Sequence, residues 1–189
     1  NLSDLEIDNI AFQCETLSHG TPSGIDNNLA TFGQPVLYSK GSRTRTRPIP
    51  LTALPPLIIA ASGTRGITHE QVAAVRARYE ENTALYTTIF DEIDEMSVAG
   101  AAALRDGDYD LLGSLMNVCH GFLNAIQVST PELERMVSIA REAGATGAKL
   151  TGSGGGGSIV ALCPGSSEAV SEALADAGYQ IVPLAGSTE

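Results

Sequence analysis

Apolar residues recur at three- and four-residue intervals in long stretches of the chain, which is the spacing of amphipathic helices. The pattern predicts six helical stretches: residues 3–18, 26–30, 72–105, 109–126, 131–144 and 167–177. Two helix starts have further support. Thr130 precedes Pro131 and two acidic residues, an order typical of a helix N-terminus. Thr68, with Gln71 three residues later, is expected to be the N-cap of the long central helix.

Short apolar runs between turn signals predict the strands. They cover residues 35–39, 44–49, 57–61, 148–151, 158–163 and 179–184. Strands separated by pairs of helices, with neighbouring strands at the end, favour an α+β fold that carries its helices on one face of the sheet. Four prolines between residues 48 and 56 indicate a domain junction, so residues 1–50 and 56–189 are expected to form separate domains.

Charge restricts the partners of the chain. The 189 residues carry a net charge of -11, so nucleic acid is not expected as a partner. Because 43% of the residues are hydrophobic, a packed core is expected. The arginines at 43, 45 and 47 alternate with threonines and are expected to lie on the exposed face of a strand. A phosphate contact is the alternative interpretation of this cluster.

Cysteine use and hydropathy indicate a cytoplasmic protein. Cys14, Cys119 and Cys163 lie far apart without metal-ligand spacing, and their apolar surroundings predict three buried thiols, as expected in a reducing compartment. No apolar run is long enough to span a membrane, so no membrane partner is expected.

A glycine-rich run, Lys149-Leu-Thr-Gly-Ser-Gly-Gly-Gly-Gly-Ser158, lies between two predicted strands. Consecutive glycines are costly in backbone entropy, so a close approach to a ligand or to another segment is expected to offset that cost. Backbone N–H groups in such a loop can bind an anion, often a phosphate. The run leads from strand to strand and matches neither common nucleotide-binding glycine motif. A flexible linker is disfavoured because a buried strand follows at once.

Two carboxylates flank a Gly/Pro turn near the N-terminus. Glu15 and His19 are four residues apart and share a helix face, and Asp26 lies near the start of the next predicted helix. An ionised carboxylate in such a place can orient a hydroxyl, accept its proton or hold Mg²⁺. A helix cap at Asp26 and a surface pair of Glu15 with His19 remain equally consistent with the spacing.

The segments His-Gly-Thr-Pro-Ser-Gly-Ile-Asp-Asn (19–27) and Lys149–Ser158 resemble motifs of the GHMP kinases, which phosphorylate small molecules. Residues 116–123 and 129–133 extend the likeness to nearly the whole chain, and it is closest to the members that phosphorylate mevalonate. The resemblance implies a ferredoxin-like C-terminal domain, with helices on one face of an antiparallel sheet, over residues 56–189. Residues 1–50 would be a remnant of the N-terminal kinase domain.

The resemblance also implies roles for single residues. Asp26 matches the catalytic aspartate, and Glu15 matches the acid that helps to hold Mg²⁺. Ser23, His19 and Thr68 lie where the family binds its substrate. The family segment that lies against the nucleotide phosphates is matched by Gly152, Ser153, Gly154, Gly155 and Gly156. The implied cofactors are ATP and Mg²⁺, the substrate is mevalonate or a similar alcohol, and a homodimer is expected.

The chain departs from the family in lacking the Pro-x-x-x-Gly-Leu-Gly-Ser-Ser-Ala type of ATP loop. We therefore expect it to be the C-terminal part of a kinase and to be inactive alone. Two alternatives stay open. One is another GHMP kinase, such as one for phosphomevalonate, although a phosphorylated substrate favours more cations. The other is a non-catalytic binding or oligomerisation module.

Overall fold

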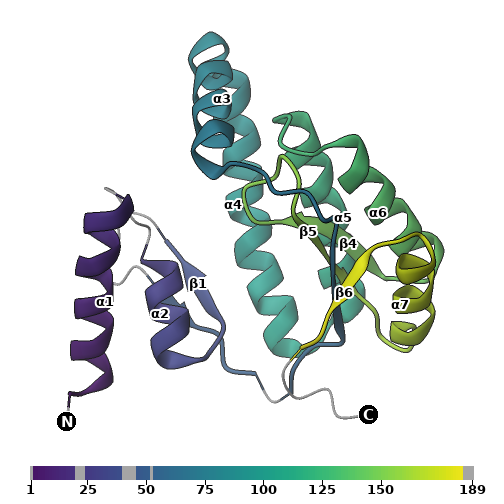
Figure 1. Cartoon of the computed structure of the whole chain (residues 1–189), viewed down its shortest axis with the longest axis horizontal. Coiled ribbons are helices and arrows are strands. Elements are labelled where there is room, and N and C mark those ends of the chain that lie inside the picture. Colours follow the sequence, from purple (N-terminus) through teal and green to yellow (C-terminus); the bar gives the residue numbers. More distant parts are fainter. Residues whose placement is uncertain (1, 20–23, 40–45, 52, 185–189) are drawn as a thin grey trace. The chain divides into compact units, whose positions relative to one another are not determined.

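The computed structural model describes residues 2–19, 24–39, 46–51 and 53–184 (Figure 1). The chain divides into two compact units, Asn1–Ala53 and Leu54–Glu189, and each is described by itself.

The first unit joins two helices and a strand pair. Helix α1 spans Asp4–His19 and α2 spans Ile25–Phe32, while β1 (Val36–Tyr38) pairs antiparallel with β2 (Thr46–Pro48). These elements confirm the predicted helices and, in the described residues, the predicted strand pair. The two helices are joined by the buried Asn27, whose Nδ2 donates to the Asp8 carboxylate at 2.7 Å.

The second unit is built on a four-stranded sheet. Its strands are β3 (Leu57–Ala61), β4 (Gly147–Thr151), β5 (Ser158–Leu162) and β6 (Gln180–Val182). They lie in the order β4-β5-β3-β6, and every neighbouring pair is antiparallel. Side chains alternate between the faces of a sheet, and one face enters the hydrophobic core. That face carries Ile58, Ala60, Ala148, Leu150, Ile159, Ala161 and Ile181.

Five helices accompany this sheet in the described part of the second unit. They are α3 (Thr68–Glu81), α4 (Thr83–Asp106), α5 (Tyr109–Ala125), α6 (Pro131–Glu142) and α7 (Ser167–Asp176). Helix α6 contacts β4 and β5, α7 contacts β3 and β6, and α4 packs on α5, which lies along β4. The expected α+β class with an antiparallel sheet is confirmed.

Two predictions for the central helices are wrong. The stretch expected to form one helix breaks at Asn82, where φ is -143° and ψ is 65°, and the Asn82 side chain accepts a hydrogen bond from the N–H of Leu85 at 3.5 Å. Thr68 is the first residue of α3 and not its cap, which is Ile67. The hydroxyl of Thr68 instead lies 3.2 Å from that of Ser153. By contrast, the cap at Thr130 is confirmed, because its hydroxyl accepts from the N–H of Leu133 at 3.2 Å.

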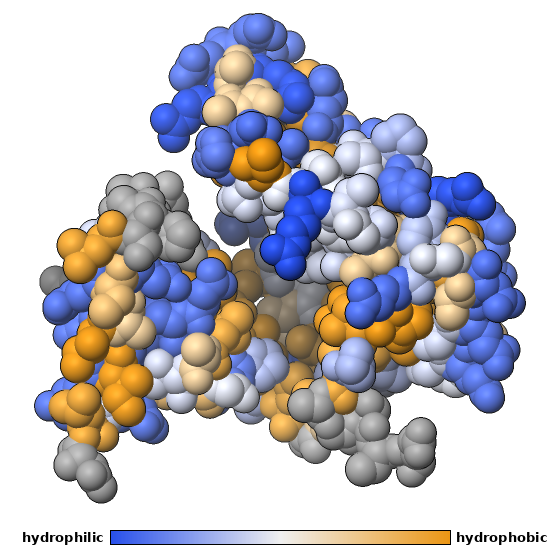
Figure 2. Space-filling view, in the orientation of Figure 1, coloured by the Kyte–Doolittle hydropathy of each residue, from blue (hydrophilic) through white to orange (hydrophobic). Residues whose placement is uncertain are grey.

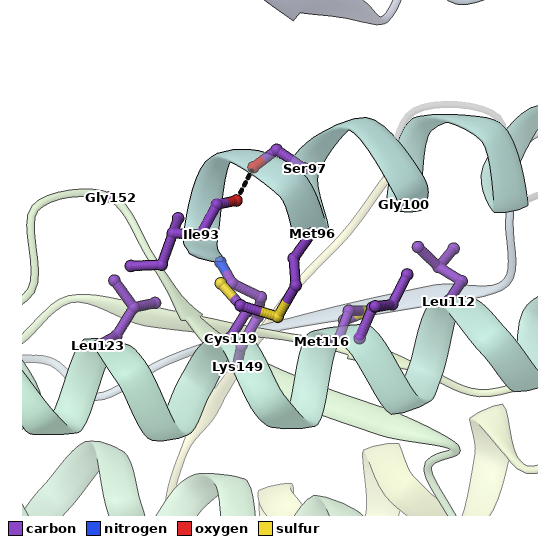
Figure 3. A pocket seen from close by; sticks show the side chains of 11 residues that line it. Ile93, Met96, Ser97, Gly100, Leu112, Met116, Cys119, Leu123, Lys149 and Gly152 are labelled. Carbon is purple, nitrogen blue, oxygen red and sulfur yellow. Dashed lines mark hydrogen bonds between the residues drawn. The ribbon is translucent and has the colours of Figure 1, made fainter. Parts of the chain in front are cut away.

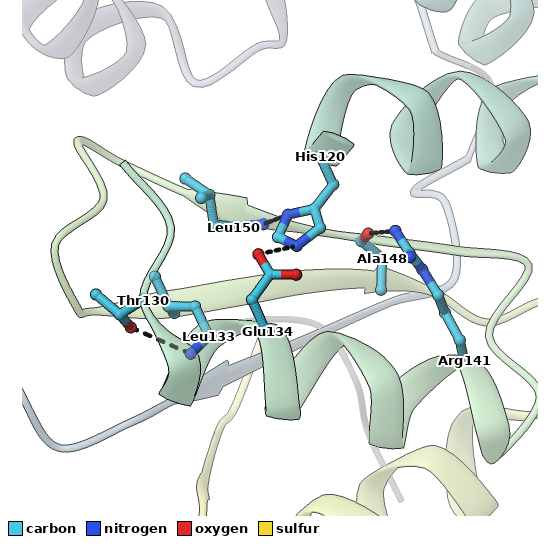
Figure 4. A network of polar contacts seen from close by, with 7 residues as sticks. All are labelled: His120, Thr130, Leu133, Glu134, Arg141, Ala148 and Leu150. Atoms are coloured by element: carbon cyan, nitrogen blue, oxygen red, sulfur yellow. Dashed lines mark hydrogen bonds and ion pairs between the residues drawn. The ribbon is translucent and has the colours of Figure 1, made fainter. Parts of the chain in front are cut away.

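Side chains cover the free edge of β4 (Figure 4). Asn117 on α5 donates to the carbonyl of Thr146 at 3.1 Å and accepts from the N–H of Ala148 at 3.0 Å. Farther along, the N–H of Leu150 donates to Nδ1 of His120 at 3.3 Å. Arg141 donates to the Ala148 carbonyl at 2.8 Å, and Lys149 donates to the Leu150 carbonyl at 2.9 Å. The edge backbone is therefore paired without a further strand.

The three cysteines differ in burial, contrary to the expectation of three buried thiols. Cys163 is buried, and burial raises the pKa of its thiol to about 11. Cys119 is half-buried, and Cys14 on α1 is exposed. None of the helices in the described ranges combines the length and apolarity that a membrane crossing requires.

Candidate functional site

The glycine-rich run forms the loop between β4 and β5. Its backbone requires glycine at five positions, since φ is positive at residues 152 (80°), 154 (75°), 155 (71°), 156 (129°) and 157 (91°). A residue with a Cβ atom is strained at positive φ, whereas glycine is not. The sequence thus specifies a loop shape that few other residues could adopt.

Backbone hydrogen bonds fix the loop to two neighbouring segments. The N–H of Gly155 donates to the Val128 carbonyl, and the N–H of Gly157 donates to the Thr64 carbonyl, both at 2.8 Å. A Cβ at Gly154 would collide with the Val128 carbonyl oxygen, and one at Gly66 would collide with the carbonyl of Gly154. The glycine-rich run was expected to approach either a ligand or another chain segment. At Gly154 and Gly66 the close approach is to another segment, backbone against backbone.

The outer side of the loop lines a pocket of about 400 Å³. Thr68 and Ser153 face it as a hydroxyl pair, and Arg65 is the cationic side chain among its lining residues. The pocket also includes Gly152, Gly154 and Gly156 of the run. A guanidinium beside two hydroxyls is a donor set suited to phosphate or carboxylate oxygens.

Five of the predicted site residues thus share one pocket, namely Thr68, Gly152, Ser153, Gly154 and Gly156. Gly155 is not among the lining residues, and a Cβ there would meet the side chain of Gln71. Sequence reasoning missed Arg65, although its place in the Gly63-Thr64-Arg65-Gly66 turn could have indicated a cation held in a loop.

The remaining predicted residues lie in the first unit. Asp26 is exposed in the first turn of α2. Glu15 is half-buried on α1. Ser23 lies outside the described residues, as does the side chain of His19, the last residue of α1.

The described residues hold no group of three or more His, Cys, Asp or Glu side chains able to bind a metal ion. A single carboxylate such as Glu15 still fits Mg²⁺ chemistry of the kind in which substrate phosphates supply other ligands. The pocket at the glycine loop likewise fits an anionic group by its donors.

Comparison with known proteins identifies the domain. Residues 101–180 match the family model described as "GHMP kinases C terminal". Residues 101–180 therefore belong to the GHMP kinase C-terminal family. The mevalonate kinase of Pyrococcus horikoshii is 40% identical over 182 residues, which are 94% of this chain and 53% of that protein. The mevalonate kinase of Pyrococcus furiosus is 37% identical over the same shares.

Solved structures agree with this GHMP kinase fold. The crystal structure of L. major mevalonate kinase in complex with R-mevalonate is similar with a TM-score of 0.85 and 35% identity, covering 93% of this chain and 55% of that one. The Methanococcus jannaschii mevalonate kinase has a TM-score of 0.79 at 24% identity, which shows a shared fold. The chain spans about half the length of the relatives it matches.

Proposed function

We propose that this chain is part of an ATP-dependent mevalonate kinase, which transfers the terminal phosphoryl group of ATP to a hydroxyl of mevalonate. The observation that carries the proposal is the likeness to mevalonate kinases, at 40% identity over 94% of the chain. The L. major relative, at 35% identity, was solved with R-mevalonate bound.

In this proposal Asp26 is the catalytic base. It accepts the proton of the mevalonate hydroxyl while that oxygen forms a bond to the terminal phosphorus of ATP and the bond from phosphorus to the ADP oxygen breaks. Its exposure and its place in the first turn of α2 support this role. Mg²⁺, when bound, neutralises charge on the phosphates, and Glu15 is the residue proposed to hold it.

The glycine-loop pocket is the proposed phosphate side of the reaction. Arg65 supplies positive charge, and the hydroxyls of Thr68 and Ser153 orient the bound groups. Ser23 and His19 are proposed on the substrate side. Residues 1–50 are proposed to be the remnant of the N-terminal kinase domain, and the protein is proposed to be a cytoplasmic homodimer.

The test is ADP release by the complete gene product with ATP, Mg²⁺ and one acceptor at a time: mevalonate, phosphomevalonate, homoserine or galactose. Mevalonate should give the highest kcat/KM. Asp26→Asn should lower kcat about 10²–10⁴-fold, the usual contribution of a general base. Asp91→Asn, a matched change at an exposed position on α4, should leave kcat unchanged.

Two results would contradict the proposal. Faster turnover of another acceptor would reassign the substrate within the family. Equal rates for the Asp26→Asn and Asp91→Asn proteins would remove Asp26 from the catalytic role.

A further inference from the structure

A second pocket of the GHMP kinase domain lies between α4 and α5 and has a volume of about 340 Å³ (Figure 3). Its walls are largely apolar and include Met96 from α4 and Leu112, Met116 and Leu123 from α5. Methionine side chains adapt to ligands of different shape. A pocket of this size with apolar walls and few polar groups is the usual form of a small-molecule site.

One cationic side chain lies in this apolar lining. Lys149 reaches the pocket from β4, and its amine points into the space between the two helices (Figure 3). It donates to the Leu150 carbonyl at 2.9 Å, which uses one of its three N–H donors. No carboxylate in the described part of the chain forms an ion pair with it. Burial lowers the pKa of the Lys149 amine, because the charged form loses its hydration.

Lys149 is half-buried, and the ionisable group beside its amine in the pocket is the thiol of Cys119. A half-buried cation without a carboxylate partner is unfavourable, and an anion from solution would relieve that cost. We propose that the α4–α5 pocket binds a small amphipathic monocarboxylate, with its carboxylate on Lys149 and its apolar chain against Met96, Met116, Leu112 and Leu123. A single amine matches a single negative charge, whereas a diphosphate would call for several cations. The proposal stands apart from the kinase reaction, since it concerns binding alone.

The pocket also touches the glycine loop. Gly152 lines this pocket and the one at the candidate phosphate site, and Lys149 lies on β4, three residues before it. The two pockets therefore share the first residue of the loop.

The three methionines of the chain provide the test, using octanoate as the probe and methionine labelled with ¹³C at its methyl group. Octanoate should shift the NMR signals of Met96 and Met116 in a saturable way. The signal of Met136, which is fully buried away from the pocket, should stay unchanged and serves as the internal control. Octan-1-ol, which has a similar chain and no charge, should bind about tenfold more weakly or worse, given the strength of hydrogen bonds to charged groups.

Lys149→Met keeps most of the side-chain volume and should weaken octanoate binding about tenfold while leaving octan-1-ol binding unchanged. Arg105→Met removes one positive charge at an exposed position outside the pocket and should change neither. The proposal is overturned if octanoate and octan-1-ol bind the unmodified chain equally, or if octanoate leaves the Met96 and Met116 signals in place. Equal octanoate binding by the Lys149→Met protein would overturn it as well, and the lysine would then serve only the edge of β4.

Discussion

Neighbouring glycines of the loop between β4 and β5 meet different surroundings, although their backbone conformations are similar. Gly152 and Gly154 have φ values of 80° and 75°. A Cβ at Gly152 would meet open space, whereas one at Gly154 would strike the Val128 carbonyl. The two positions therefore separate the cost of positive φ from the cost of collision.

Gly152→Ala should lower the free energy of unfolding by about 1 kcal/mol, the strain of an L-residue in the left-handed region. Gly154→Ala should lower it by about 2 kcal/mol more, because the loop must also move away from Val128. Urea denaturation of both proteins measures the difference. Equal losses would mean that the contact with Val128 adds nothing to stability.

His120 is a buried polar residue of α5 that lies beside the edge of β4 (Figure 4). Because its Nδ1 accepts from the N–H of Leu150, the neutral ring carries its proton on Nε2, which lies 3.0 Å from Oε1 of Glu134. Burial lowers the pKa of His120 from its ordinary 6.5; the charge of Glu134 opposes this shift, and the charges of Arg141 and Lys149 add to it. The pKa of Glu134 is also lowered, since its hydrogen bonds and the charge of His120 outweigh the effect of burial.

This arrangement makes folding weaker in acid. The unfolded His120 takes up its proton near its ordinary pKa of 6.5, whereas the folded one does so only at lower pH. The contribution of neutral His120 to the free energy of unfolding is therefore fully present above pH 6.5. It should fall as the pH drops through that value toward the lowered pKa. Urea denaturation between about pH 7.5 and 5 measures the slope. His120→Asn, which retains an acceptor for Leu150 but cannot titrate, should flatten it, and His69→Asn at an exposed position should not.

At the scale of elements, α5 does more than pack on the sheet. Asn117 takes the place of a neighbouring strand, pairing with Thr146 and Ala148 through its amide. Asn117→Ala leaves both backbone groups without this partner and should lower the free energy of unfolding by about 2 kcal/mol. Val118→Ala, on the exposed side of the same helix, should change it by less than about 0.5 kcal/mol. A loss of the same size at both positions would argue against edge pairing by Asn117.

The elements that the sequence predicts best are those with local signals. Thr130 and Pro131 mark the start of α6 because capping and fixed φ act within one turn. Asn82 is a preferred capping residue and caps α4, but the apolar periodicity that continues across it into α4 predicts one unbroken helix.

In the candidate site, too, some residues could be predicted from local sequence and others could not. Its glycines are visible in the sequence because they repeat. Arg65 and the pairing of Thr68 with Ser153 depend on contacts between segments more than 80 residues apart, which periodicity does not report.

At the scale of the whole molecule, the first unit exposes apolar side chains along α1 (Figure 2). Ile10 and Leu17, two turns apart on one face, are 49% and 90% exposed. Contiguous apolar surface of this kind favours association. The chain should therefore self-associate in a concentration-dependent manner, and sedimentation velocity measures this.

The double change Ile10→Glu and Leu17→Glu should shift the sedimenting species toward the monomer without lowering the free energy of unfolding, because exposed side chains contribute little to the core. Val98→Glu, at a 51% exposed position on α4, is the matched control and should leave association as it is. If the unmodified chain is monomeric at all concentrations, the apolar face of α1 is not an association surface. The chain already carries a net charge of -11, so added negative charge can itself oppose association. If Val98→Glu shifts the protein toward the monomer as much as the double change does, charge rather than the apolar face of α1 controls association.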